Sequence, residues 1–311
     1  TRVCPCMNIE RTSAVSDVSA GPAAVFAVLA DPRTHAAIDG TGWVTEAVDA
    51  APLTRVGQLF TMGMFHEGHL ALMRRARKEN DVLTVSLFVN PAQFGPGEDF
   101  ESYPRNQEAD LRKAENEGVD LVFMPGVEEI YPPGDRTFIE VEGLSDVLCG
   151  ERRPGHFRGV TTVVAKLFAL CLPHRAYFGK KDFQQWVIIR RMVSDLRMDV
   201  EVVGCPTARE RNGLALSSRN VYLDDEDRAR AVGLRRALLS VSEGFRGGDG
   251  DVLALVEIAS KILEEHGLRR DYLVIVHPET LVSLDEITGS AVVLGAVWCG
   301  KARLIDNLEL D

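Results

Sequence analysis

Short apolar runs alternate with amphipathic helical patterns from residue 55 onward. The apolar runs predict strands over residues 56–60, 82–89, 119–124, 176–178 and 200–203. Apolar residues at helical spacing predict helices over residues 69–79, 106–117, 160–172 and 183–196. Because strands that alternate with helices are typical of a parallel sheet covered by helices, we expect an α/β fold with helices on both faces of the sheet.

The pattern changes near Gly204-Cys205-Pro206. Helical patterns follow over residues 225–240 and 251–266, and strand-like runs follow over residues 273–276, 291–297 and 302–305. A hairpin-like break at Cys299-Gly300-Lys301 separates the last two runs. These elements predict a smaller C-terminal α+β domain.

Composition narrows the class of protein. The 311 residues are 45% apolar, which is enough for a sizeable core, and the net charge of −11 argues against nucleic-acid binding. The six cysteines form no Cys-x-x-Cys pair and no cluster with zinc spacing, so we expect buried thiols in a reducing cytoplasm. No apolar run reaches the 18 or so residues of a membrane span, and we therefore expect no membrane association.

The sharpest local signal is the stretch from Thr61 to His69, which follows an apolar strand and precedes an amphipathic helix. In a parallel sheet that junction lies at the carboxyl edge, where ligands bind against helix N-termini. Gly63 and Gly68 permit close backbone approach to a phosphate, and His66 and His69 can donate to the same anion. Two partly buried structural histidines are the plainer interpretation.

Three further clusters carry polar groups suited to a ligand site. Residues 177–185 place two lysines at a strand end, and residues 209–220 combine arginines, serines and a glycine in a loop suited to polyphosphate. Residues 88–94 place two amides beside a proline that stops a strand. Taken singly, solvated surface lysines and a polar capping loop would explain the first two equally well.

Together and in this order, the four clusters resemble those of the pantothenate synthetases, a family of the nucleotidyltransferase superfamily. The likeness rests on motifs spread over residues 55–311: Thr-Met-Gly-x-x-His-Glu-Gly-His, Phe-Val-Asn-Pro-x-Gln-Phe, Tyr-Pro-Arg, His-Phe-x-Gly-Val, Gly-x-Lys-Asp-x-Gln-Gln and Ser-Ser-Arg-Asn. The resemblance implies a Rossmann-like domain over residues 55–205 and a C-terminal lid or substrate domain over residues 206–311.

The resemblance also implies an activity. Pantoate would attack the α-phosphate of ATP to give pantoyl adenylate and pyrophosphate, and β-alanine would then attack the acyl carbon and release AMP, a step of coenzyme A biosynthesis. Magnesium would accompany the nucleotide, with no metal site built from the protein alone. The family also implies a cytoplasmic homodimer.

Site residues follow by carrying the family motifs onto this sequence. The ATP site would comprise Met62, Gly63, Met64, Phe65, His66, Glu67, Gly68, His69, Gly179, Lys180, Lys181, Asp182, Ala208, Leu216, Ser217, Ser218 and Arg219. Among them, the catalytic groups would be His66, His69, Lys181 and Arg219. The residues that contact pantoate or β-alanine would be Asn90, Gln93, Tyr103, His156 and Gln185.

Several positions depart from the family pattern. Phe60 stands in place of a proline, Met64-Phe65 in place of Ala-Leu, Lys180 in place of an acidic residue and Asn212 in place of an aspartate. Residues 1–54 form an atypical leader, and residues 1–60 resemble the start of a START-like polyketide cyclase domain. We expect no separate function for this leader.

Two other functions stay open at this stage. One is a different His-x-Gly-His nucleotidyltransferase that stops at the nucleotide-linked product. The other is an inactive nucleotide-binding protein, produced by the altered N-terminus.

Overall fold

The computed structural model describes residues 56–61, 65–95, 98, 100–101 and 106–310. The expected leader, residues 1–54, lies outside the described residues. Five parallel strands form the first sheet, in the order β3-β2-β1-β4-β5. Their bounds are β1 Val56–Thr61, β2 Val82–Leu87, β3 Leu121–Phe123, β4 Arg175–Gly179 and β5 Glu201–Cys205. The strand order reverses between β1 and β4, which is the point where open α/β sheets bind ligands.

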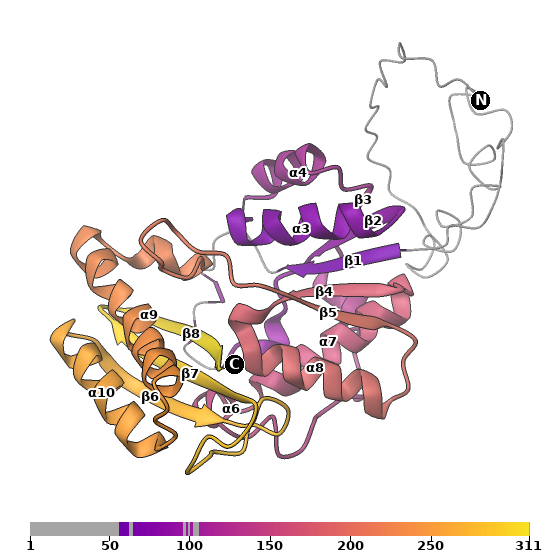
Figure 1. The fold of residues 1–311 in the computed structure, drawn as a ribbon. Helices are drawn as coiled ribbons and strands as arrows, with labels where there is room; N and C mark the ends of the chain where they lie inside the picture. The colour runs from indigo at the N-terminus through magenta and orange to yellow at the C-terminus, as the bar shows by residue number, and fades with distance from the viewer. Residues whose placement is uncertain (1–55, 62–64, 96–97, 99, 102–105, 311) are drawn as a thin grey trace, which may run out of the picture. The chain divides into compact units, whose positions relative to one another are not determined.

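Helices cover both faces of this sheet (Figure 1). They are α3 Glu67–Glu79, α4 Gln107–Asn116, α7 His156–Cys171 and α8 Phe183–Asp195. Strand β4 shows why two helical layers form: Tyr177 lies in the core cluster beneath α3, whereas Ala176 and Phe178 lie in the cluster beneath α7 and α8. Alternate side chains of a strand point to opposite faces, so a strand with large apolar side chains on both faces needs cover on both sides.

The C-terminal part is a three-stranded antiparallel sheet packed against two helices. Helices α9 Asp225–Arg246 and α10 Val252–Glu265 precede strands β6 Arg269–Val276, β7 Ala291–Cys299 and β8 Ala302–Leu310. One face of β7 contributes Val293 to the core shared with α9 and α10, whereas Val292 joins the core cluster that contains α8. The expected fold class is therefore confirmed, including the break between the last two strands.

Element boundaries differ most from the predictions at two strands and two helices. Strand β6 begins at Arg269 rather than at residue 273, and β8 ends at Leu310 rather than at residue 305. Helix α7 begins at His156 rather than at residue 160, and α9 ends at Arg246 rather than at residue 240. Residue 159 lies inside α7, and it must be a glycine because a Cβ there would come within 2.2 Å of the Ala92 carbonyl oxygen. The glycine therefore lets α7 contact the backbone of the turn that follows β2, and it is not a helix stop.

The sequence pattern did not predict the shortest elements. These are η2 Pro91–Gln93, α5 Val127–Ile130, α6 Cys149–Arg152, η3 Lys180–Asp182 and η4 Ser218–Tyr222. A single turn carries too few residues to show a helical period. Three of them, η2, η3 and η4, carry or adjoin predicted site residues.

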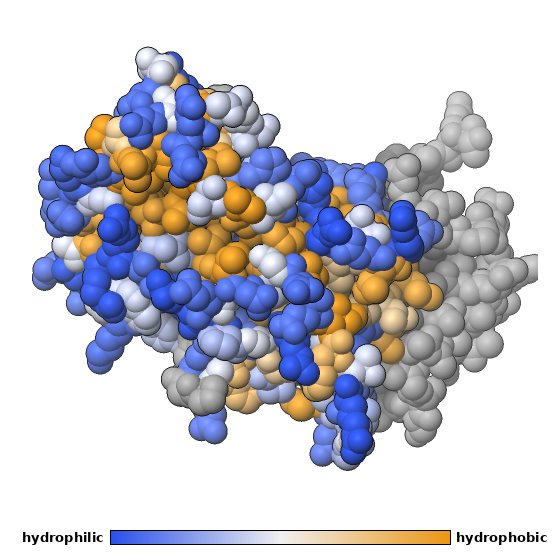
Figure 2. All heavy atoms as spheres, turned by 90° about the horizontal axis from the view of Figure 1, so that it is seen from below, coloured by the Kyte–Doolittle hydropathy of each residue, from blue (hydrophilic) through white to orange (hydrophobic). Residues whose placement is uncertain are grey.

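Some apolar side chains lie on the surface of the molecule (Figure 2), whereas the cysteines of the described part are buried. Figure 2 shows one face of the molecule, on which apolar side chains gather between charged and polar ones. Among the helices of the described part, none is long and apolar enough to cross a membrane. Four of the six cysteines lie in that part, and all four are buried free thiols: Cys149, Cys171, Cys205 and Cys299.

Candidate active site

His66 and His69 stand side by side where β1 leads into α3. His66 is the N-cap of α3, and its Nδ1 accepts a hydrogen bond of 3.1 Å from the Gly68 N–H. The Nδ1 of His69 accepts one of 3.3 Å from the His66 N–H, so the two residues form a reciprocal capping box. Their ring centroids are 4.1 Å apart. The two imidazoles therefore lie against each other at the first turn of α3.

These contacts fix the protonation of both rings. Burial lowers the pKa of His66 to about 4, and the charge of Lys181 acts in the same direction. Burial lowers the pKa of His69 to about 3, and His66 and Lys181 add to that effect. Both rings are therefore neutral at pH 7, and because Nδ1 accepts in each, the proton sits on Nε2. Each imidazole is thus a hydrogen-bond donor through Nε2.

Gly68 makes this arrangement possible. A Cβ at residue 68 would lie 2.8 Å from Cε1 and 2.9 Å from Nδ1 of His66, closer than such atoms approach. The structure thus gives the glycine a definite role: it lets the His66 ring fold back over the first turn of α3. Gly63, the other glycine expected to approach a phosphate, lies outside the described residues.

A network of amides forms beside the histidines at the end of β2. The Asn90 Nδ2 group donates to Gln93 Oε1 at 3.1 Å and to the Gly159 carbonyl at 3.0 Å, and Asn90 Oδ1 accepts from the Tyr131 hydroxyl at 2.8 Å. Asn90 and Gln93 are both buried. Because every polar atom of Asn90 has a partner, the network fixes the position of the Gln93 amide.

His156 and Arg153 extend this network. Nδ1 of His156 is 2.8 Å from the Gln93 carbonyl oxygen, and its Nε2 is 3.0 Å from Arg153 Nη1. Arg153 in turn donates to both carboxylate oxygens of Glu98, at 2.7 and 2.5 Å. Burial lowers the pKa of His156 to about 4, and the Arg153 charge acts in the same direction. His156 is therefore neutral, and it connects the Gln93 backbone to the ion pair between Arg153 and Glu98.

Cationic groups come from two loops. Lys181 lies in η3 directly after β4, with its Nζ 3.4 Å from an Asp182 carboxylate oxygen. The second loop runs from residue 206 to residue 219, where the Ser217 side chain accepts from the Arg219 N–H at 3.3 Å and caps η4. Both loops follow the carboxyl ends of strands, as the parallel topology predicts.

These groups line a common cavity of about 220 Å³, the smaller cavity. The predicted site residues on its wall are His66, Gly68, His69, Asn90, Gln93, His156, Gly179, Lys181, Asp182, Gln185, Ala208, Leu216, Ser217, Ser218 and Arg219. A larger cavity of about 730 Å³ adjoins it, and seven residues lie on both walls: Arg153, His156, Lys181, Asp182, Gln185, Ser217 and Arg219. The first sheet, α3, α7 and the two loops surround the smaller cavity, whereas β6, β7, β8 and α9 supply much of the larger one.

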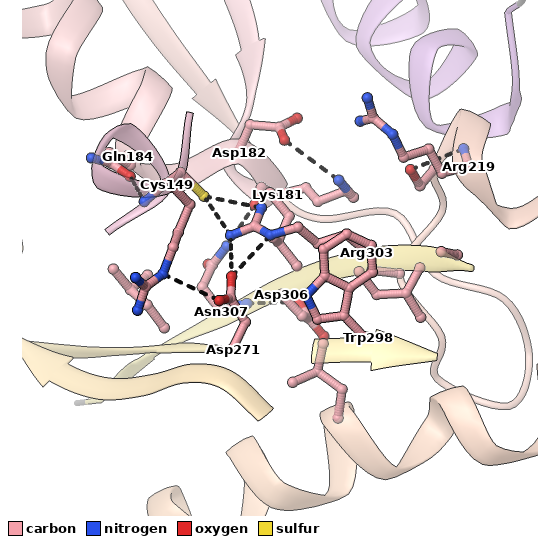
Figure 3. Close-up of a pocket in the computed structure, with 18 of the residues that line it drawn as sticks. Cys149, Lys181, Asp182, Gln184, Arg219, Asp271, Trp298, Arg303, Asp306 and Asn307 are labelled. Atoms are coloured by element: carbon pink, nitrogen blue, oxygen red, sulfur yellow. Dashed lines mark hydrogen bonds and ion pairs between the residues drawn. The ribbon is translucent and has the colours of Figure 1, made fainter. Parts of the chain in front are cut away.

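Two arginines of the larger cavity are paired with one aspartate. Figure 3 shows the Arg303 guanidinium directed at Asp271 and Cys149. Its Nη2 is 2.7 Å from an Asp271 carboxylate oxygen, and Nη1 and Nη2 both lie 3.6 Å from the Cys149 sulfur. Arg152 adds a second contact to Asp271 at 3.2 Å.

Three predicted ATP-site residues do not lie on the wall of the smaller cavity. Phe65 is buried in the core, where its N–H donates to Asp110 at 2.8 Å. Glu67 is exposed and pairs with Arg74, because the first turn of α3 directs it away from the histidines. Lys180 pairs with Glu309 at 2.8 Å, and its ammonium lies 4.8 Å from the centroid of the Trp186 ring.

Four more of the predicted residues, Met62, Gly63, Met64 and Tyr103, lie outside the described residues. The smaller cavity is also lined by three residues that no sequence motif indicated: Ser86, Arg153 and Thr207. Arg153 lies three residues before His156, inside a stretch whose His-Phe-x-Gly-Val motif was recognised. Ser86 is the only one of the three on a strand, near the carboxyl end of β2, where ligand-facing residues are expected. Among the described residues, no group of three or more His, Cys, Asp or Glu side chains could hold a metal ion.

Comparisons with known proteins agree with this geometry. The family model described as pantoate-beta-alanine ligase matches residues 38–309, beginning ahead of residue 55, where we expected the likeness to start. A pantothenate synthetase from Thermus thermophilus is 53% identical over 270 residues, covering 86% of this chain and 97% of that protein. One from Acetivibrio thermocellus is 51% identical over 257 residues, covering 82% of this chain and 92% of the relative.

Solved structures give the same result. The crystal structure of the Thermus thermophilus pantothenate synthetase matches with a TM-score of 0.80 at 52% identity, over 83% of this chain and 94% of that chain. A pantoate-beta-alanine ligase from Francisella tularensis, complexed with beta-gamma ATP and beta-alanine, matches with a TM-score of 0.68 at 34% identity, over 82% and 89% of the two chains. From its sequence and its fold, this chain belongs to the pantoate–β-alanine ligase family.

Proposed function

We propose that this chain is an ATP-dependent ligase that joins pantoate to β-alanine through a pantoyl-adenylate intermediate. One observation carries the proposal: His66, His69, Lys181 and Arg219, which come from three separate segments, line a single cavity at the carboxyl edge of the parallel sheet. The names of the relatives and the ATP and β-alanine in the Francisella tularensis structure support the same reaction.

The first step joins an anion to an anion. A carboxylate oxygen of pantoate forms a bond to the α-phosphorus of ATP, and the bond between that phosphorus and the bridging oxygen breaks, releasing pyrophosphate. Negative charge grows on the phosphoryl oxygens and on the leaving group. A site that speeds this step must therefore offer fixed donors and positive charge to those oxygens, and it needs no enzyme nucleophile.

The side chains of the smaller cavity have that character. His66 and His69, neutral with their protons on Nε2, would donate hydrogen bonds to phosphate oxygens. Lys181 and Arg219 would neutralise the triphosphate, and Arg219 can bind two oxygens at once. Since both histidines have low pKa values, their contribution before ATP binds is that of oriented neutral donors.

The side-chain amides of Gln93 and Gln185 suit the acid substrate, pantoate. Pantoate carries hydroxyl groups as well as its carboxylate, and the Gln93 and Gln185 amides offer both donors and acceptors to such groups. Asn90 would act by fixing Gln93, since its own polar atoms already contact Gln93, Gly159 and Tyr131. In the second step the β-alanine amine bonds to the acyl carbon, the carbon–oxygen bond to AMP breaks, and the amine loses a proton.

Magnesium would enter with the nucleotide. Mg²⁺ prefers oxygen ligands and often keeps several waters together with substrate phosphates. The Asp182 carboxylate on the wall of the smaller cavity is an oxygen donor of that kind. We also propose a cytoplasmic homodimer, and residues 206–311 as a lid or substrate domain over residues 55–205. Light scattering would test the dimer.

The direct test is pantoate-dependent exchange between ATP and labelled pyrophosphate, followed by addition of β-alanine. We expect exchange only when pantoate is present, and pantothenate only after β-alanine is added. Exchange without pantothenate would favour a nucleotidyltransferase that stops at the adenylate. Absence of both exchange and ATP binding, with the protein folded, would contradict the proposal.

A further inference from the structure

Strand β8 contacts both of the loops that carry the cationic groups of the smaller cavity. The buried contacts come from two adjacent residues in the middle of the strand, Asp306 and Asn307, which we call the β8 clasp. The exposed Glu309 adds a side-chain pair with Lys180. Figure 3 shows Asp306 and Asn307 on this strand close to Lys181. Both clasp residues line the larger cavity, and neither is on the wall of the smaller one.

Asn307 holds the first loop through its backbone. Its Nδ2 group donates to the Lys180 carbonyl at 2.8 Å and to the Lys181 carbonyl at 3.0 Å. Both protons of one amide group are therefore used on two successive peptide units of η3. These bonds restrict the peptide from which the Lys181 side chain departs.

Asp306 holds the second loop through Arg209. The two carboxylate oxygens accept from Arg209 Nη1 at 2.7 Å and from Nη2 at 2.9 Å, a bidentate pair with the aspartate almost fully buried. Arg209 Nη1 also donates to the Gly213 carbonyl at 3.1 Å, and the Arg209 backbone bridges to Ala215. The loop is therefore fixed just before Ser217, Ser218 and Arg219.

The two halves of the clasp are joined to each other. Asp306 Oδ1 accepts the Asn307 backbone N–H at 2.8 Å, so the contact to Arg209 and the contact to η3 meet at one peptide. Lys181 and Arg219 belong to segments that follow different strands, β4 and β5. A short rigid element that contacts both segments sets the spacing between the two charges.

We propose that Asp306 and Asn307 are positioning residues for nucleotide binding, which set the separation of Lys181 and Arg219 across the triphosphate. The inference rests on the proposed function of the smaller cavity and adds residues from the C-terminal sheet to it. Because two charges at the wrong separation bind a triphosphate less tightly, loosening either contact weakens ATP binding without removing any group that contacts substrate.

The test removes the side-chain donor of Asn307. Asn307→Asp replaces the donor by an acceptor that faces two carbonyls, and Asn307→Ser is a smaller alternative if the aspartate prevents folding. We expect KM for ATP in pantoate-dependent pyrophosphate exchange to rise about tenfold, with kcat changed less and KM for pantoate unchanged. Glu309→Gln is the matched control on the same strand, because it removes only the side-chain pair with Lys180. We expect wild-type KM for ATP in this control.

A double-mutant cycle tests the other half of the clasp. If Asp306 acts through Arg209, Asp306→Asn raises KM for ATP in the wild type but adds little in an Arg209→Gln background. Additive effects of the two substitutions would overturn this assignment. A fall in melting temperature with unchanged KM for ATP would show that the clasp is only structural, and would also overturn it.

Direct titration with ATP separates this inference from the proposed function. If wild-type protein binds ATP but shows no exchange, the proposed ligase function fails. The β8 clasp is then tested by comparing the ATP affinities of the two variants. Weaker ATP binding by Asn307→Asp than by Glu309→Gln supports it, and equal binding refutes it.

Discussion

The two cavities of this protein differ in how their charged groups are held. In the larger one, Arg303 and Arg152 both contact Asp271, so these two guanidinium groups already have an anionic partner within the protein. In the smaller one, backbone N–H groups hold the Nδ1 side of His66 and of His69, and the opposite nitrogen of each of these rings carries the proton. Lys181 and Arg219 lie on both walls, so what the smaller cavity adds for a triphosphate is the pair of Nε2 donors of His66 and His69. Strand ends and helix N-termini, rather than size, therefore mark the reactive site.

The largest expected effect comes from removing one of the paired donors. His69→Ala should lower adenylation by about 10²–10³, because one fixed donor to a developing oxyanion is worth that much. The measurement is kcat for pantoate-dependent pyrophosphate exchange, with circular dichroism to verify folding. Near-normal exchange by a folded variant would remove His69 from the reaction.

A smaller loss is expected when both histidines remain but one ring is displaced. Gly68→Ala places a Cβ 2.8 Å from the His66 ring, so that ring must move, and we expect exchange to fall about tenfold to a hundredfold. Stability should change little, because alanine favours the helix by about 1 kcal/mol over glycine and the lost cap costs about as much.

Gly289→Ala is the matched control, since a Cβ at residue 289 meets no atom within 4 Å. We expect it to keep wild-type exchange. If Gly68→Ala also keeps it, the close packing of the His66 ring has no part in the activity.

Arg303→Met separates the two cavities most clearly. It leaves Asp271 half-paired, and we expect the free energy of unfolding to fall by about 1–3 kcal/mol, the usual cost of an incompletely satisfied buried polar group. Exchange should stay within about threefold of wild type at a temperature where the variant is folded. Loss of exchange by a folded Arg303→Met protein would show that the larger cavity takes part in adenylation. Urea unfolding measures the change in the free energy of unfolding, and the exchange assay measures the change in activity.

The smallest effect is a dependence of stability on pH. Below pH 6.5 the unfolded chain binds protons at its histidines, whereas folded His69, with a pKa of about 3, does not. Stability must therefore fall as pH drops from about 6.5 toward 3. His69 should contribute about 1–2 kcal/mol to the fall between pH 7 and pH 5. Urea unfolding of wild type and His69→Gln at both pH values should show a smaller drop in the variant, and equal drops would contradict a neutral buried His69.

Much of the fold could be read from the sequence because its strands and long helices are strongly periodic. The parallel sheet, the final hairpin and the pairing of His66 with His69 followed from such patterns. The turns η2, η3 and η4 could not be predicted, since one turn has no period. The ion-pair partner of Lys180 could not be predicted either, because only tertiary structure brings Glu309, far along the chain, close enough to pair with it.

The site illustrates the same limit. The motifs located the histidines and the two cationic loops, but they did not indicate that Asp306 and Asn307 contact both loops. Those contacts join residues about 100 or more positions apart, and local sequence carries no signal for them.

A crystal structure of the chain with pantoate and a non-hydrolysable ATP analogue tests the central claim most directly. We expect triphosphate oxygens within hydrogen-bond distance of Nε2 of His66 and His69, and of the charged groups of Lys181 and Arg219, in the smaller cavity. A triphosphate bound instead against Arg303 and Arg152 in the larger cavity would contradict it.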